Sequence, residues 1–201
     1  METQTTRRRR HAAADAMRGS PAAQSTCDTP TPLGAMRLAA SAGAMTGAWF
    51  VDQRDAPPPA QAPAIPEDEA VLAQAALQLQ AWFRRERTEF DVPMAPRGTA
   101  FQMQVWQALC ELPFGATISY GELAVRVGRP RAARAVAQAV GRNPLSILIP
   151  CHRIVGHDTS LTGFGGGLAR KQALLVHEGH VYRGGGERSR VIPQGQLPLE
   201  L

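Results

Sequence analysis

The residues with the clearest chemical potential lie in one short string, Pro150-Cys151-His152. Cys151 follows a mainly apolar run at 146–149, which predicts a buried strand that would hold the cysteine at a fixed place. A thiol becomes a useful nucleophile when its thiolate form is favoured, and His152 is a candidate activator. Neighbouring residues in an extended chain point to opposite sides, so we expect a bridging water between these two side chains. The string predicts a nucleophilic cysteine.

A histidine that acts as a base needs a partner on its other ring nitrogen, and Glu178 is the candidate for His152. Glu178 lies at the end of the last clear predicted helix, where the helix dipole disfavours a negative charge. This position indicates a specific partner, although exposure to water would also explain it. The other cysteines, Cys27 and Cys110, have no comparable neighbours and are expected to be small buried side chains.

Composition limits the class of protein. The chain has 201 residues, of which 44% are hydrophobic and 19% charged, as expected for one or two compact domains. No stretch approaches the roughly 18 apolar residues of a membrane span, and no secretory apolar segment is visible. The 3 cysteines lie far apart and can form neither a disulfide framework nor a four-cysteine zinc site, which indicates a reducing compartment.

Charge is distributed unevenly along the chain, whose net charge is +5. Residues 21–96 hold five Arg and nine acidic residues, whereas residues 97–190 hold eleven Arg, one Lys and five acidic residues. This asymmetry is expected where only one part of a protein meets a polyanion such as nucleic acid. A solvated basic face is the alternative.

The first half predicts a tail, a hairpin and a helix. Residues 1–28 are Arg-rich without an apolar period and predict a mobile basic tail, whose role in DNA affinity or targeting stays open. Residues 31–52 predict a β-hairpin that turns at 41–43. Pro66 and the acidic residues after it predict a helix start. The segment 91–98 holds two prolines and a glycine and is the expected domain boundary.

The second half predicts short helices. Capping-box patterns at Thr99 and Ser119 begin two of them. The second is closed by Gly128, and Pro130 is then expected at the first position of a helix that ends at Gly141. Two short helices joined by a tight turn predict a helix-turn-helix, although structural helix bundles share this pattern.

The last predicted helix of this pair is rich in alanine and carries Arg131 and Arg134 at i, i+3 spacing. Such a helix can approach a phosphate backbone closely, or it can form a tight contact with another helix. Further along, the glycine-rich segment 162–167 precedes a helix and predicts a loop whose backbone amides approach a ligand. Its spacing matches neither a dinucleotide fingerprint nor a P-loop.

The string IPCHRIV, preceded by SYGELA, AARAV and RNP and followed by LTGFGGG, RK and LLVHEG, resembles the bacterial O6-alkylguanine-DNA alkyltransferases. The resemblance covers residues 31–180. It implies an α+β protein with a small N-terminal α/β domain, which has an antiparallel, RNase H-like sheet, and a mainly helical domain with a winged helix-turn-helix. The expected divisions are a basic tail at 1–28, the two domains at 29–96 and 97–184, and a flexible tail at 185–201.

The resemblance implies irreversible, stoichiometric transfer of an alkyl group from O6-alkylguanine in double-stranded DNA to Cys151, which inactivates the protein. O4-alkylthymine stays open as a second substrate. By the same resemblance, His152 would act through a bound water, Glu178 would orient His152, and Asn143 would brace the cysteine loop. Tyr120 would donate a proton or hydrogen bond to the departing guanine. No cofactor is expected, because the DNA supplies the alkyl group.

The resemblance also implies that the helix-turn-helix binds in the minor groove and flips the damaged base out, with Arg134 filling the gap. The residues implied at the DNA are Tyr120, Gly121, Arg129, Arg131, Ala133 and Arg134. Those implied in the alkylguanine pocket are Val140, Ile154, Phe164 and Gly165. We expect a cytoplasmic monomer with no metal and no membrane partner, and cooperative binding along DNA stays open.

Two features depart from the family pattern. Phe164 stands where many members have Tyr, and Gly165 and Gly166 leave the loop without side chains, so larger alkyl groups are a further expectation. Zinc sites of other members are not expected, because Cys27 and His11 are the only thiol and imidazole groups before Cys110. The alternatives are a noncatalytic binder of alkylated DNA, a transcription factor with an inert thiol, and a cysteine hydrolase; the setting of Cys151 favours the transferase.

Overall fold

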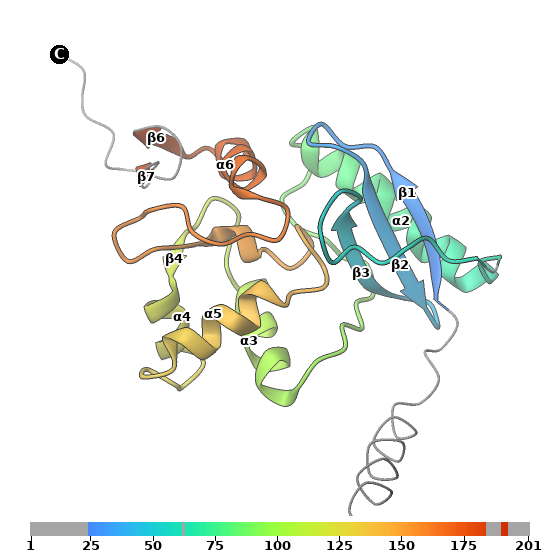
Figure 1. Cartoon of the computed structure of the whole chain (residues 1–201). Coiled ribbons are helices and arrows are strands. Elements are labelled where there is room, and N and C mark those ends of the chain that lie inside the picture. Colours follow the sequence, from blue (N-terminus) through green and yellow to red (C-terminus); the bar gives the residue numbers. More distant parts are fainter. Residues whose placement is uncertain (1–23, 62, 184–189, 193–201) are drawn as a thin grey trace, which may run out of the picture.

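The computed structural model describes residues 24–61, 63–183 and 190–192. A sheet and one long helix from the first half of the chain lie on one side of the molecule, and the helices of the second half lie on the other (Figure 1). Most of the predicted basic tail lies outside the described residues.

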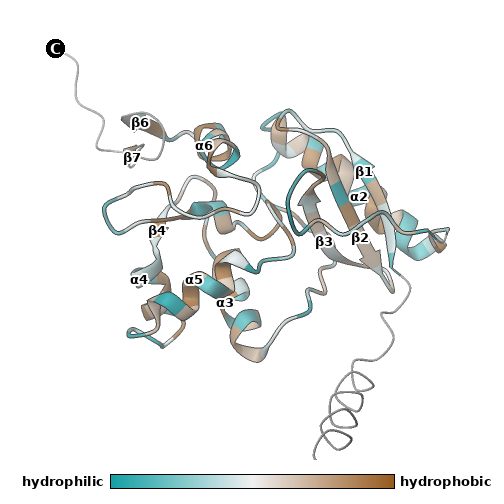
Figure 2. Cartoon of the chain, in the orientation of Figure 1, coloured by the Kyte–Doolittle hydropathy of each residue, from teal (hydrophilic) through white to brown (hydrophobic). Residues whose placement is uncertain are grey.

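The sheet has three antiparallel strands in the order β1 (Ser25–Thr29), β2 (Met36–Ser41) and β3 (Ala44–Phe50). Ala42 and Gly43 join β2 to β3 with φ angles of 54° and 72°. Positive φ at both positions is what a two-residue hairpin turn of type I′ requires. The predicted hairpin is therefore confirmed. Five of the six residues of β2 are buried, and the strand is largely hydrophobic in Figure 2.

The prediction that the tail extends to residue 28 is wrong, because β1 already begins at Ser25. Ser25 and Thr29 are buried and pair with Ala40 and Met36 of β2. The Ser25 hydroxyl donates to the buried carboxylate of Asp68 at 2.7 Å. Polar side chains thus fill inward positions of this strand, so the strand carries no apolar period that sequence reasoning could detect.

Helix α2 (Pro66–Phe83) packs against the sheet and begins at the predicted proline. Three acidic residues occupy its first turn, where they interact favourably with the helix dipole. Its buried apolar face consists of Val71, Leu72, Ala75, Leu79 and Trp82. This helix and the sheet share one hydrophobic core with the helices of the second half.

The edge of β3 that faces away from β2 is hydrogen-bonded to two later segments. The amide of Met45 donates to the Pro93 carbonyl at 2.8 Å, within the predicted boundary segment. The amide of Ala48 donates to the Pro144 carbonyl at 2.8 Å, and the amide of Ser146 donates to the Ala48 carbonyl at 2.9 Å. Segment 144–146 leads directly to Cys151, so the N-terminal sheet helps to position the reactive cysteine.

The second half is mainly helical, which confirms the α+β prediction. Its elements are α3 (Ala100–Cys110), β4 (Ile118–Ser119), α4 (Tyr120–Arg126), α5 (Ala133–Gly141), η1 (Cys151–Arg153), β5 (Ile154–Val155), α6 (Leu168–His177), β6 (Val181–Arg183) and β7 (Arg190–Ile192). The capping boxes predicted at Thr99 and Ser119 are both present. Strands β4 and β5 are parallel. No helix in the described part of the chain is long and apolar enough to cross a membrane.

Two predicted boundaries in this half are wrong. Helix α5 begins at Ala133 and not at Pro130, because the Ala132 amide donates to the Arg129 carbonyl at 2.8 Å and closes a turn first. The expected tail from residue 185 contains β7, which pairs with β6. Val191 of β7 is 2% exposed and donates its amide to the Thr159 carbonyl at 3.0 Å, so burial and a long-range hydrogen bond hold this strand.

Candidate active site

The segment before Cys151 is a compact turn and not the buried strand predicted from its apolar residues. The Asn143 side chain accepts from the Leu145 amide at 3.0 Å and donates to the Ile149 carbonyl at 2.8 Å. Ile147 has a φ of 74°, which is costly for a β-branched residue and persists only where the surroundings impose it. The apolar run is buried as predicted, but only its start is hydrogen-bonded to β3, and the Asn143 side chain binds the backbone at its end.

Cys151 begins the short turn η1, and 7% of its surface is exposed. Burial raises the pKa of the Cys151 thiol, while a hydrogen bond from Asn143 and the positive charge of Lys171 act in the opposite direction. Burial is the largest of these effects, so the thiol keeps its proton at neutral pH. The cysteine therefore needs a base to become a nucleophile.

His152 is fully buried, and its Nε2 lies 3.0 Å from Oε1 of Glu178. An ionised carboxylate can only accept, so Nε2 carries the hydrogen and Nδ1 carries the lone pair. Nδ1 is buried and has no hydrogen-bond partner among the described residues. Burial lowers the pKa of His152, although Glu178 opposes this, so the ring is neutral at neutral pH. A neutral ring with a free Nδ1 can accept a proton.

Glu178 is also held by Arg153, a residue that sequence reasoning did not single out. The Arg153 guanidinium donates to the Glu178 carboxylate at 2.8 to 3.1 Å, and the Gly115 amide donates to it at 3.0 Å. Burial alone would raise the pKa of Glu178, but His152 and Arg153 outweigh it and lower the pKa to about 2. The carboxylate that faces His152 is therefore fixed in place and ionised.

A cavity of about 100 Å³ opens at Cys151. Its lining consists of Tyr120, Ala137, Val140, Gly141, Cys151, Gly163, Phe164 and Gly165. The Tyr120 hydroxyl donates to the Thr162 carbonyl at 3.4 Å. Burial raises the pKa of Tyr120, so the phenol stays protonated, and its single O–H can turn from this long hydrogen bond to a ligand in the cavity.

Of the residues predicted in the alkylguanine pocket, Val140, Phe164 and Gly165 line this cavity, and Ile154 does not. Ile154 is fully buried in β5, where it pairs with Ile118 of β4. The strand pair therefore holds Ile154 in the hydrophobic core.

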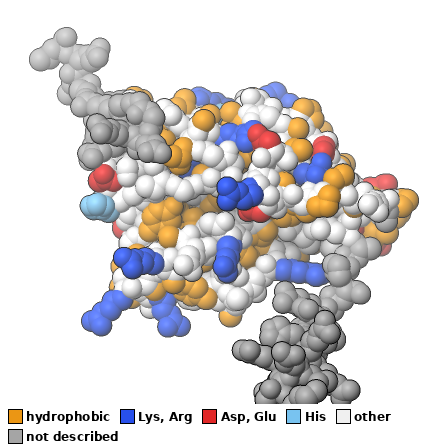
Figure 3. Space-filling model, viewed as in Figure 1, with side chains coloured by type: hydrophobic (Ala, Val, Ile, Leu, Met, Phe, Trp, Pro, Cys, Tyr) orange, Lys and Arg blue, Asp and Glu red, His pale blue; other side chains and the backbone are white. Residues whose placement is uncertain are grey.

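The residues predicted at the DNA lie together on the helix-turn-helix. Tyr120 and Gly121 begin α4, Arg129 and Arg131 lie in the turn, and Arg134 is in the first turn of α5 beside Ala133. All three arginines are exposed. Basic side chains gather on this part of the surface, at the lower left of Figure 3. The cavity at Cys151 lies next to this basic surface, because Tyr120 of α4 and Val140 of α5 line it.

The family profile described as "6-O-methylguanine DNA methyltransferase, DNA binding domain" matches residues 100–180. The methylated-DNA–protein-cysteine methyltransferase of Mycobacterium leprae is 46% identical over 150 residues, which cover 75% of this chain and 89% of that protein. The chain belongs to this family. The Haemophilus influenzae methyltransferase is 44% identical over 151 residues, which cover 74% of this chain and 83% of that protein.

Solved structures of related methyltransferases have the same fold. The Mycobacterium tuberculosis O6-methylguanine methyltransferase superposes with a TM-score of 0.67 at 40% identity, covering 77% of this chain and 92% of that one. The structure of Mycobacterium tuberculosis OGT in complex with DNA gives a TM-score of 0.66 at 42% identity, covering 77% and 91% of the two chains.

This methyltransferase also contains a fully buried lysine, Lys171, that sequence reasoning did not single out. Its ammonium group donates to the carbonyls of Ile154, Thr162 and Gly163. Burial lowers the pKa of Lys171 to about 8, and the charge of this lysine in turn favours the Cys151 thiolate. The burial of Lys171 could have been predicted from its spacing, because it lies three and four residues before Leu174 and Leu175 and so shares the buried face of α6 with them.

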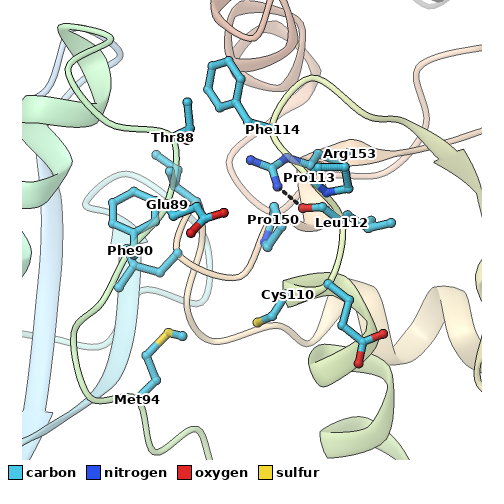
Figure 4. A pocket seen from close by; sticks show the side chains of 13 residues that line it. Thr88, Glu89, Phe90, Met94, Cys110, Leu112, Pro113, Phe114, Pro150 and Arg153 are labelled. Atoms are coloured by element: carbon cyan, nitrogen blue, oxygen red, sulfur yellow. Dashed lines mark hydrogen bonds between the residues drawn. The ribbon is translucent and has the colours of Figure 1, made fainter.

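A larger cavity of about 300 Å³ lies behind the cysteine loop of the methyltransferase (Figure 4). Phe90 and Met94 form one side, and Leu112 and Phe114 lie on the other (Figure 4). Arg153 borders this cavity and donates to the Leu112 carbonyl. Cys151, His152 and Tyr120 do not line it, so the smaller cavity, and not the larger one, is the candidate reactive site.

Proposed function

We propose that this methyltransferase transfers the methyl group from O6 of guanine in DNA to the sulfur of Cys151. The observation that carries the proposal is the arrangement around Cys151, which lies in a cavity wall with Tyr120 while the adjacent His152 is held by an ionised Glu178. The name of the Mycobacterium tuberculosis relative, an O6-methylguanine methyltransferase, supports the choice of substrate. We place the reaction in the cytoplasm, where an unpaired thiol stays reduced.

In the reaction, the sulfur attacks the methyl carbon opposite the oxygen, so that a carbon–sulfur bond forms as the carbon–oxygen bond breaks. The thiol proton passes through a water to Nδ1 of His152 and later leaves to solvent, and the released guanine anion takes up one proton from solvent. The charge of Glu178 stabilises the imidazolium that forms. The product is a thioether, which has no easy route back to the thiol, so each protein molecule acts once.

The departing guanine gains negative charge and needs hydrogen-bond donors. The Tyr120 phenol is protonated and lies in the cavity wall, where it would donate to the guanine ring. A backbone amide of the loop at Phe164 and Gly165 would supply a second donor. Fixed donors at this place favour the transition state, because the charge on the guanine appears only as the bond to the methyl group breaks.

A methyl group on a stacked, paired guanine cannot reach a buried sulfur, so the nucleotide must rotate out of the duplex at a cost of a few kcal/mol. We place α5 in the minor groove, where the small side chain of Ala133 permits close approach. Arg134 would fill the gap in the base stack, and Arg129 and Arg131 would bind phosphates, which makes the affinity for DNA depend on salt. A single chain supplies all of these groups, so we propose that the protein acts as a monomer.

Replacing Arg134 with Ala should slow methyl transfer from a duplex far more than transfer from free O6-benzylguanine, because only the duplex requires base flipping. The measurement is the second-order rate constant on each substrate. Arg142→Ala removes the same charge at the opposite end of α5 and should leave the ratio of the two rate constants unchanged. Equal losses on both substrates in the Arg134 variant would contradict the proposed role.

The proposed function is tested by intact-mass analysis after incubation with a duplex that contains one O6-methylguanine. The expected result is one added methylene, roughly 14 Da, mapped to the peptide that contains Cys151, as covalent transfer to this nucleophile requires. Tight binding of the lesion without a mass change would overturn the transfer and favour a noncatalytic binder. A second duplex with O4-methylthymine determines whether that base is also a substrate.

A further inference from the structure

The loop that forms one wall of the cavity at Cys151 also contacts the N-terminal domain. Phe164 packs edge to face on Phe50 of β3, with ring centroids 6.5 Å apart. A Cβ added to Gly165 would lie 2.6 Å from the Gln53 side chain, and one added to Gly166 would lie 2.7 Å from Phe50. Gly166 is therefore needed for close approach between the loop and the N-terminal domain, because the aromatic rings beside it leave no space for a Cβ, whereas the end of the Gln53 side chain could turn away from a Cβ at Gly165.

Two consecutive residues of α6 hold this loop at its two ends. Lys171 donates to the carbonyls of Thr162 and Gly163, at the start of the loop. Arg170 donates to the Gly166 carbonyl at 3.2 Å, at its end. Phe164 and Gly165, which lie between these two anchors, line the cavity together with Gly163.

Arg170 also binds the N-terminal domain by three separate contacts. Its Nε donates to the Leu33 carbonyl at 2.8 Å, and its Nη2 pairs with the Asp52 carboxylate at 2.9 Å. The guanidinium lies over the ring of Phe50, 4.3 Å from the centroid. One side chain thus joins the cavity wall to the strand whose aromatic ring supports Phe164.

We propose that Arg170 is a positioning residue through which the N-terminal domain sets the wall of the alkyl cavity and thereby limits the size of the alkyl group that Cys151 accepts. This inference rests on the proposed function. A cavity of about 100 Å³ is small beside the roughly 300 to 1,000 Å³ typical of small-molecule sites. A methyl group needs little displacement of Phe164, whereas a benzyl group requires the wall to move away from Cys151. The contacts of Arg170 and Phe50 oppose that movement.

The test compares second-order rate constants for transfer from two duplexes of identical sequence, one containing O6-methylguanine and the other O6-benzylguanine. Both require base flipping, so the benzyl-to-methyl ratio reports the cavity wall. Arg170→Gln removes the ion pair with Asp52 and the several N–H donors of the guanidinium. We expect the benzyl-to-methyl ratio to rise by about tenfold, which is the equivalent of one hydrogen bond to a charged group. Arg170→Lys should partly restore the wild-type ratio, because it keeps the charge beside Asp52.

Arg37→Gln is the matched control. Arg37 also makes three side-chain hydrogen bonds, to both carboxylate oxygens of Asp28 and to the Pro57 carbonyl, but these do not involve the loop. This variant should lose stability and keep the wild-type ratio. Asp52→Asn provides a milder change if Arg170→Gln folds poorly, because the Asp52 side chain is 67% exposed, and its ratio should shift in the same direction.

The outcomes separate the two proposals. A ratio that stays at the wild-type value in both Arg170→Gln and Asp52→Asn, with a wild type that transfers methyl groups, overturns the positioning role alone. The same rise in Arg37→Gln would show a general loosening of the N-terminal domain and would also overturn it. A wild type that takes up neither group overturns the proposed function, and the positioning role with it.

Discussion

Replacing Cys151 with Ser should abolish methyl uptake while the protein still folds and binds DNA. Serine has nearly the same size as cysteine, but a hydroxyl is a far weaker nucleophile at neutral pH, and a thiolate is what the buried His152 can generate. The measurement is the intact mass after incubation with a duplex that contains O6-methylguanine. The wild type should gain roughly 14 Da, the mass of one methylene left by transfer to the nucleophile, and the Cys151→Ser variant should gain nothing.

Cys110→Ser is the matched control, because it makes the same chemical change at a cysteine that does not line the cavity at Cys151. The expectation that Cys110 and Cys27 are buried is wrong, since Cys110 is exposed and Cys27 is only partly buried. This variant should take up methyl groups at the wild-type rate. Continued uptake by the Cys151→Ser variant, with the added mass mapped to Cys110 or Cys27, would contradict the assignment of the acceptor.

The parts of the fold predicted correctly have signals that lie within a few residues. The capping boxes at Thr99 and Ser119 depend on contacts three residues apart, and the hairpin depends on a two-residue turn whose second residue, Gly43, readily accepts positive φ. Local contacts of this kind form in the same way whatever surrounds them, so the residue types alone indicate them.

The segments predicted wrongly depend on distant partners. The apolar run before Cys151 becomes a turn because Asn143 binds its backbone and Ala48 of β3 pairs with its start. Pro130 has the local signal of a first helical position, yet a hydrogen bond from Ala132 to Arg129 places it in a turn. In each case a competing hydrogen bond, absent from the local pattern, determines the backbone conformation.

In the candidate site, the contact between Glu178 and His152 could be predicted because an acid at a helix C-terminus is locally unfavourable. Arg153 and Lys171 could not be identified in the same way. A single charged residue in a sequence is usually solvated, and these two are buried only because the fold brings them to Glu178 and to backbone carbonyls. The buried charges of Arg153 and Lys171, which shift the pKa values in the site, are thus the part of the site that is hardest to predict from the sequence.

Replacing Glu178 with Gln should have the largest effect on stability, because it leaves the buried Arg153 without its counter-charge. Breaking a buried ion pair from one side costs about 3–5 kcal/mol in the free energy of unfolding. Loss of the carboxylate also weakens His152 as a base, so the rate of methyl uptake should fall roughly 10²-fold, on the order of the contribution of a positioned general base. The measurements are urea denaturation and the uptake rate below the unfolding transition.

Glu86→Gln is the matched control, since it makes the same change in an exposed ion pair with Arg84. Surface pairs contribute little to stability, so the denaturation midpoint and the uptake rate should both stay close to those of the wild type. An equal loss of stability in the two variants would show that the buried network around Glu178 contributes no more than a surface pair.

The stability difference between the wild type and Glu178→Gln should also depend on pH. The pKa of Glu178 is lowered to about 2 in the folded protein, from an ordinary value of 4.5. Because the folded state binds this proton less readily than the unfolded state, the carboxylate contributes its full stability above about pH 4.5 and loses it as the pH falls toward 2. The difference measured by urea denaturation should therefore be constant near neutral pH and shrink at about pH 3. A difference that stays constant down to pH 3 would mean that Glu178 acts through its shape and not through its charge.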